Sequence, residues 1–229
     1  MVFDLLGPSV DALVGARCGG RLGLKSALLV VGQVLDSLEF VHSKLLVHRD
    51  IKPQNFLVGA RGGPAAARVH LVDFGTSAPY RHPQTRAHAP WAQDATGMVG
   101  NALYASANAH QGVQLARRDD VESLSYVLVR FLKGALPWEG VDEGRTLQPH
   151  QIVALMRAKQ AATPVAELCA GLPPEVGAFV AHARGLRYDQ EPDYALLRKL
   201  LGAMMEREGH ARDYVYDWDD ADVLAAAAK

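Results

Sequence analysis

A short polar segment, His48–Asn55, limits what this chain can fold into more than any other stretch. It reads HRDIKPQN and is followed at a short interval by Val72–Gly75, which reads VDFG. The first segment combines a carboxylate, a lysine two residues later and an asparagine three residues after that, and the second segment adds another carboxylate. Side chains of these types act on one substrate only if they share a cleft. The fold must therefore bring the two segments together.

These residue types suit phosphoryl transfer. Asp50 can accept the proton of an attacking hydroxyl, and Lys52 can neutralise charge that develops on the transferred group. A solvated loop that carries the same charges by accident is the alternative, but the fixed spacing and the second segment argue against it. We predict three catalytic residues, Asp50, Lys52 and Asn55. Asp73 is predicted to bind the cofactor ATP, and Asn55 and Asp73 are predicted to be the Mg²⁺ ligands.

The first segment resembles the catalytic loop of protein kinases, and Lys52 is typical of kinases that act on serine and threonine. Further blocks along most of the chain resemble the casein kinase I family. They are DLLGPS at 4–9, YASAN at 104–108, RRDDVESL at 117–124, LPWEG at 136–140, RYD at 187–189, PDY at 192–194 and DYVYDW at 213–218. The resemblance implies a protein serine/threonine kinase that uses ATP and Mg²⁺. Its partners would be protein substrates that carry Ser or Thr.

The same resemblance implies a mainly α structure, the C-lobe of the α+β protein-kinase fold, in which a helical bundle carries short β-hairpins with the catalytic and VDFG loops. Residues 4–9 would be the hinge, with Phe3 at the gatekeeper position and the backbone of Leu6 binding adenine. Leu57 would form the floor under adenine. Asp120 would be the buried aspartate that fixes the backbone of the catalytic loop.

The resemblance begins at the hinge. Kinases carry a glycine-rich strand pair, a strand lysine and a helix glutamate before it. The glycines at 15, 19, 20 and 23 do not spell GxGxxG, and we interpret them as a plain loop. We therefore interpret residues 1–218 as an incomplete kinase domain, hinge plus C-lobe without the N-lobe, from a truncated or partial gene product, and residues 219–229 as a short tail. A non-catalytic kinase-like binding module that keeps the substrate-docking surface is the alternative.

Hydrophobic periodicity predicts the elements around these segments. Apolar residues recur every three to four positions from Leu24 to about Lys44, which indicates an amphipathic helix. Two short strands are expected at 56–58 and 69–72, joined by a turn over 61–67. Residues 76–106 lack periodicity, so we interpret them as an activation segment with a substrate-docking loop. Further helices are expected over 10–14, 117–132, 150–159, 174–184 and 194–208.

The composition and charge of the chain limit the size of its core, its classes of partner and its cellular compartment. With 49% hydrophobic and 21% charged residues, the 229-residue chain can bury one substantial core. A net charge of -1 predicts no general attraction to nucleic acid or to a membrane surface. Cys18 and Cys169 are expected to be free thiols, which together with the lack of a long apolar run favours a cytoplasmic or nuclear protein. His82, His88 and His110 lack metal-site spacing, so we interpret them as surface residues.

Three departures from the casein kinase I pattern bear on activity and partners. Asn101 stands where the family has a threonine whose hydroxyl bridges the catalytic aspartate and lysine, but an amide can still donate and accept hydrogen bonds, so the orientation of these residues can survive the change. Leu103 replaces an arginine, and the basic run after LPW is reduced to Arg145, so a preference for pre-phosphorylated substrates is in doubt.

An exposed apolar surface around Met1–Leu6 and Leu57, where an N-lobe would sit, is expected to promote association.

Overall fold

The computed structural model describes residues 5–60, 66–93, 97–144 and 146–219. Several predictions concern residues outside these ranges: the gatekeeper Phe3, the start of the hinge and of the apolar surface, most of the turn over 61–67, Arg145, and the tail apart from Asp219. Within the described ranges, none of the helices has the length and apolar character needed to cross a membrane.

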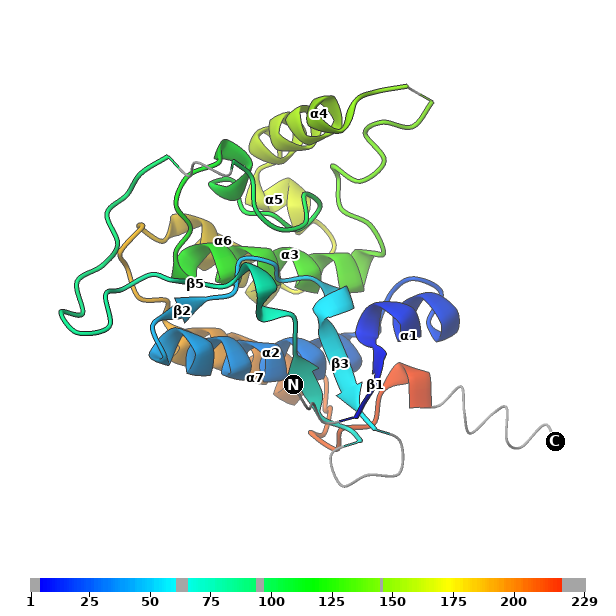
Figure 1. Ribbon diagram of the computed structural model, residues 1–229. Coiled ribbons are helices and arrows are strands. Elements are labelled where there is room, and N and C mark those ends of the chain that lie inside the picture. The colour runs from blue at the N-terminus through cyan, green and yellow to red at the C-terminus, as the bar shows by residue number, and fades with distance from the viewer. Residues whose placement is uncertain (1–4, 61–65, 94–96, 145, 220–229) are drawn as a thin grey trace.

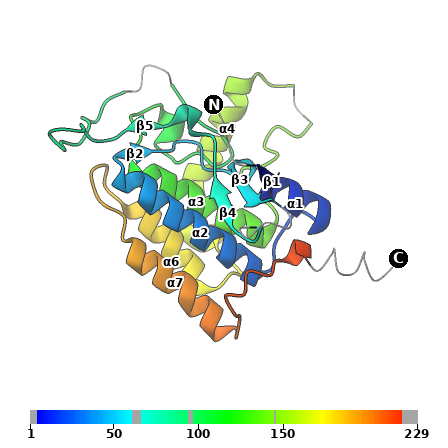
Figure 2. The same ribbon diagram turned by 60° about the horizontal axis from the view of Figure 1, so that its bottom comes forward.

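Helices are the predominant secondary structure of the described chain, and its strands are few and short (Figure 1). Four of them form a bundle in which α3 packs against α2 and α6, and α7 packs against the same two helices (Figure 2). The predicted helices are confirmed, although α1 and α4 are longer than expected and the short α5 was not predicted. Their bounds are α1 Val10–Arg17, α2 Leu24–Ser43, α3 Arg117–Lys133, α4 Pro149–Ala162, α5 Val165–Leu168, α6 Pro174–Gly185 and α7 Tyr194–Arg207.

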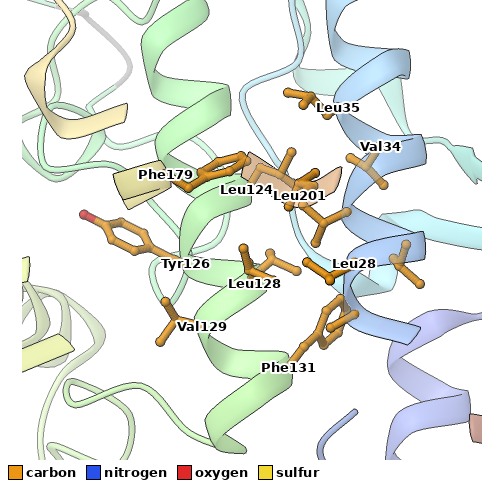
Figure 3. Close-up of a cluster of buried hydrophobic side chains, with 14 of the residues drawn as sticks. Leu28, Val34, Leu35, Leu124, Tyr126, Leu128, Val129, Phe131, Phe179 and Leu201 are labelled. Carbon is orange, nitrogen blue, oxygen red and sulfur yellow. The ribbon is translucent and has the colours of Figure 1, made fainter. Parts of the chain in front are cut away.

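The core lies between α2 and α3. Side chains such as Leu28 and Leu35 of α2 and Leu128 of α3 fill the space between the two helices (Figure 3). Phe179 from α6 and Leu201 from α7 belong to the same buried cluster. Full burial of each such side chain is worth roughly 1.5–3 kcal/mol relative to exposure. The packed bundle therefore provides a stable support for the loops of the two small sheets.

Two small antiparallel sheets carry those loops. The first has the strand order β1-β3-β4, with β1 at Leu6–Ser9, β3 at Phe56–Gly59 and β4 at Val69–Leu71. The second pairs β2, Leu46–Val47, with β5, Ala78–Pro79. The catalytic segment lies between β2 and β3, and the VDFG segment follows β4. The β3–β4 hairpin was predicted, whereas the two-residue strands β2 and β5 were not.

A close approach of β1 to β3 depends on Gly7. A Cβ atom on Gly7 would lie 2.8 Å from the carbonyl oxygen of Gly59. Directly after β1, Ser9 caps α1 by accepting a hydrogen bond from the Ala12 N–H at 3.2 Å. The hinge segment is thereby fixed between the sheet and the first helix.

The C-terminal block DYVYDW also has a structural role. Gly23 offers no side chain at the start of α2, and the carboxylate of Asp217 accepts hydrogen bonds there from the Gly23 N–H at 2.6 Å and the Ser26 hydroxyl at 2.7 Å. The rings of Tyr216 and Trp218 stack with their centroids 4.4 Å apart. Asp217, which lies 194 positions after Gly23 in the sequence, thus caps the start of α2.

Candidate active site

Asp120 at the start of α3 fixes the backbone of the catalytic segment. Its carboxylate accepts hydrogen bonds from the N–H groups of His48 at 2.7 Å and Arg49 at 2.8 Å. The His42 ring contacts the same carboxylate at 2.8 Å and meets the Tyr194 hydroxyl at 2.5 Å on its other side. The predicted structural role of Asp120 is confirmed. His42 is a buried residue, and through these contacts it joins α2, α3 and α7.

The charge on Asp120 is held inside the protein. Burial opposes ionisation, but hydrogen bonds and the positive potential of His42 and His48 hold the pKa of Asp120 below its usual range. Arg49 adopts a left-handed backbone conformation, with a φ of 71°. A non-glycine residue keeps this conformation only where its surroundings fix it, and the bond from the Arg49 N–H to Asp120 is part of that constraint.

The predicted catalytic residues lie together around the carboxylate of Asp50. The Lys52 ammonium donates to Asp50 Oδ2 at 2.6 Å, and the Asn55 amide donates to the same oxygen at 3.2 Å and to the Asp50 carbonyl at 2.8 Å. The Asn101 N–H donates to Asp50 Oδ1 at 2.9 Å. Both carboxylate oxygens are therefore held in place, and the side chain has a fixed orientation.

Asn101 serves this site through its backbone. Its side-chain oxygen accepts a hydrogen bond from the Leu103 N–H at 3.0 Å and forms a tight turn. The orientation of Asp50 is therefore kept by the Asn101 backbone N–H, and the Asn101 side-chain oxygen is used in its own turn. A side chain that satisfies its own turn is not directed to a neighbouring loop.

Asp73 lies next to this group because the β3–β4 pairing continues into the loop. The Val72 N–H donates to the Asn55 carbonyl at 3.0 Å, which places Val72 opposite Asn55 and Asp73 one residue further along the chain. Asp73 is exposed and left-handed, with a φ of 64°. The His48 ring bonds the Val72 carbonyl at 3.0 Å and packs edge-on against Phe74 at 5.0 Å. The two sequence segments thus form one site.

The donor set fits Mg²⁺. The Asn55 amide nitrogen faces Asp50, so its oxygen is left as an acceptor, and the Asp73 carboxylate is exposed. Amide and carboxylate oxygens are the ligands that Mg²⁺ prefers, with phosphate oxygens and water completing six positions. The described part of the chain has no group of three or more His, Cys, Asp or Glu residues that could hold a metal alone. Asn55 and Asp73 would therefore share the ion with the phosphates of ATP.

Leu6 and Leu57, the predicted adenine-binding residues, lie on neighbouring strands. Leu6 pairs with Gly59 and Ser9 pairs with Leu57 across β1 and β3. Both leucines are partly exposed. Within the described ranges β1 is an outer strand of its sheet, so one side of its backbone has no strand partner. A role for both residues in binding adenine stays a prediction.

The sequence did not lead us to predict the roles of two buried carboxylates near the site, those of Asp119 and Glu122. Asp119 accepts hydrogen bonds from the Ser106 hydroxyl at 2.7 Å and the Asn108 amide at 2.9 Å. Glu122 accepts from the Ala107 N–H at 3.0 Å. Burial raises the pKa of both carboxyl groups. These bonds attach residues 106–108 to α3. The available signal in the sequence was the group of acidic residues near the start of the predicted helix.

The position of Asn101 requires glycine before it. Gly100 has a φ of 88°, and a Cβ atom there would lie 2.3 Å from the Arg49 carbonyl oxygen, so the backbone would have to move. We expect Gly100→Ala to lower the free energy of unfolding by about 1–3 kcal/mol more than Gly97→Ala does. Gly97 is the matched control because its φ is 75° and no atom lies within 4 Å of its added Cβ. Thermal unfolding of both variants tests this, and equal losses would contradict the contact.

A family model for the protein kinase domain matches residues 16–212. The matched stretch contains the catalytic segment, the VDFG segment and all helices from α2 to α7.

Proposed function

Since this chain belongs to the protein kinase family, we propose that it is casein kinase I-like and transfers the γ-phosphate of ATP to serine and threonine hydroxyls of proteins. The observation that carries this proposal is the arrangement around Asp50, whose carboxylate is bound by Lys52, Asn55 and the Asn101 backbone. Fixed groups of this kind cost little reorganisation during the reaction.

Each residue has a distinct part in the proposal. Asp50 orients the attacking hydroxyl and receives its proton, and Lys52 places a positive charge beside it. Asn55 and Asp73 would hold Mg²⁺, and Leu6 and Leu57 would bind the adenine. Bound MgATP would supply the phosphoryl group and neutralise part of its charge.

The family-specific part of the proposal is supported by the blocks that resemble casein kinase I. Most protein kinases carry Ala-Pro-Glu where this chain has Ser106-Ala107-Asn108, and in this chain hydrogen bonds attach the segment to α3. The hydrogen bonds to Asp119 and Glu122 explain why a serine and an asparagine suit these positions. In the same proposal, residues 1–218 supply the hinge and the C-lobe, and an N-lobe completes the nucleotide site.

A non-catalytic kinase-like binding module is the second candidate. It would use the surface around residues 106–108 to bind a protein and would not transfer phosphate to it. The observation in its favour is that Leu57 and the exposed Leu5 and Phe74 offer apolar surface near the site for a partner. The intact arrangement of Asp50, Asn55 and Asp73 favours the catalytic candidate.

The substrate class can be tested on a fusion protein that carries a casein kinase I-type N-lobe before Val2. We expect it to phosphorylate an acidic peptide with one serine at least about a hundredfold faster than the same peptide with tyrosine. A tyrosine hydroxyl lies several ångströms further from the peptide backbone, and a misplacement of about 1 Å can already cost on the order of a hundredfold. The measurement is labelled-phosphate transfer, with the alanine peptide as blank. Similar rates on serine and tyrosine would contradict the assignment.

A further inference from the structure

Thr76, the last residue of a short 3-10 turn over Phe74–Thr76, contacts the catalytic segment at two points. Its hydroxyl donates a hydrogen bond to the His48 carbonyl at 3.0 Å, and its own carbonyl accepts one from the Arg49 guanidinium. In the sequence, Thr76 is simply the first residue of the predicted activation segment. The structure joins it to the loop that carries Asp50.

The peptide unit between His48 and Arg49 is bound at both of its polar groups. Its carbonyl accepts from the Thr76 hydroxyl, and its N–H donates to the buried carboxylate of Asp120 at 2.8 Å. The Arg49 backbone, which begins at this unit, is left-handed with a φ of 71°. Because that conformation is unfavourable for a residue with a side chain, each of the two bonds helps to hold the unit in its orientation.

This orientation bears directly on the proposed site. Asp50 follows Arg49 in the chain, so a rotation of the preceding peptide unit would shift the Asp50 backbone and turn its carboxylate. Thr76 stands three residues after Asp73, and the Asp73 carboxylate accepts from the Gly75 N–H at 3.4 Å within the same turn. The Thr76 hydroxyl therefore links the segment of the proposed base to the segment of the proposed Mg²⁺ ligand.

We propose that Thr76 is a positioning residue for phosphoryl transfer, which sets Asp50 relative to Asp73 by holding the His48 carbonyl. This proposal rests on the proposed kinase function, because it assigns Thr76 to the same site. The hydroxyl is needed, since an aliphatic side chain offers no donor to the carbonyl. The branched side chain of threonine also restricts the rotation of this hydroxyl more strongly than serine would.

Three variants of the fusion protein with an N-lobe separate positioning from a loss of stability. Thr76→Val keeps the shape of the side chain and removes the donor, whereas Thr76→Ser keeps the donor. Thr163→Val is the matched control, because the buried Thr163 hydroxyl at the end of α4 donates to the Lys159 carbonyl at 2.7 Å. We expect Thr76→Val to lower kcat about tenfold or more and to change the KM of the peptide less than about twofold, since a misplaced base impairs the reaction rather than peptide binding. Thr76→Ser and Thr163→Val should keep kcat within about threefold.

Hydrogen exchange of the Arg49 amide in residues 1–229 tests the structural step without catalysis. The Arg49 N–H and the His48 carbonyl share one peptide unit, so Thr76→Val is expected to speed this exchange about five- to tenfold, and Thr163→Val should leave it unchanged. An unchanged exchange rate in Thr76→Val, or an undiminished kcat in an active fusion, would overturn the proposal. If the unmodified fusion transfers no phosphate, the proposed function fails and with it the catalytic part of this proposal, whereas the exchange rate still decides whether Thr76 holds the peptide unit.

Discussion

Replacing Asp120 with asparagine is expected to lower the free energy of unfolding by about 3–5 kcal/mol. Asp120 is 2% exposed and accepts hydrogen bonds from two backbone N–H groups and from the His42 ring. An asparagine would offer one acceptor oxygen in place of two and would turn an amide N–H toward a donor. The buried N–H of Arg49 or His48 would then lack a partner, which is costly in a site closed to water.

Urea unfolding of residues 1–229 measures this loss. Asp36→Asn is the matched control, because Asp36 is 63% exposed in its ion pair with Arg198, and such surface pairs contribute at most about 1 kcal/mol. A similar small loss for both variants would show that Asp120 does not hold the catalytic segment in place.

Much of the fold could be predicted because long elements repeat their pattern. Helix α2 shows several turns of apolar residues at helical spacing, and its buried side chains Leu28, Val31 and Leu35 are those that the pattern selects. The strands β3 and β4 were found from their runs of apolar and β-branched residues. By contrast, β2 and β5 have two residues each, and a pattern with a period of two is undefined over that length.

The catalytic group could be predicted because its residues follow each other in the sequence. Asp50, Lys52 and Asn55 belong to one loop, and the loop itself sets their distances. The contacts of Asn101 and His110 could not be predicted, because they depend on how distant segments pack. Asn101 meets Asp50 through a backbone N–H, for which residue type carries no signal. His110, which was expected at the surface, is buried in a turn that contacts α4, a helix that follows much later in the chain.

Replacing Asp50 with asparagine is expected to reduce phosphoryl transfer about 10²–10⁴-fold in a kinase completed with an N-lobe. The amide would keep the shape of the side chain but could not take up the proton of the substrate hydroxyl. It would also turn a donor or a weaker acceptor toward the Lys52 ammonium, which now lies 2.6 Å from the carboxylate. The proposal places part of the nucleotide site in an N-lobe, so residues 1–229 alone are expected to be slower than the fusion by at least about a hundredfold.

Transfer of labelled phosphate from ATP to an acidic serine peptide tests the proposed site most directly. It is measured on the fusion protein, on residues 1–229, and on fusions that carry Asp50→Asn, Asp73→Asn or the surface control Asp36→Asn. The proposed roles predict full activity for the fusion and for Asp36→Asn, and losses of about a hundredfold or more for Asp50→Asn, Asp73→Asn and the unfused chain. An active Asp50→Asn fusion would contradict the assignment of Asp50 as the base, and rapid transfer by residues 1–229 alone would contradict the need for an N-lobe.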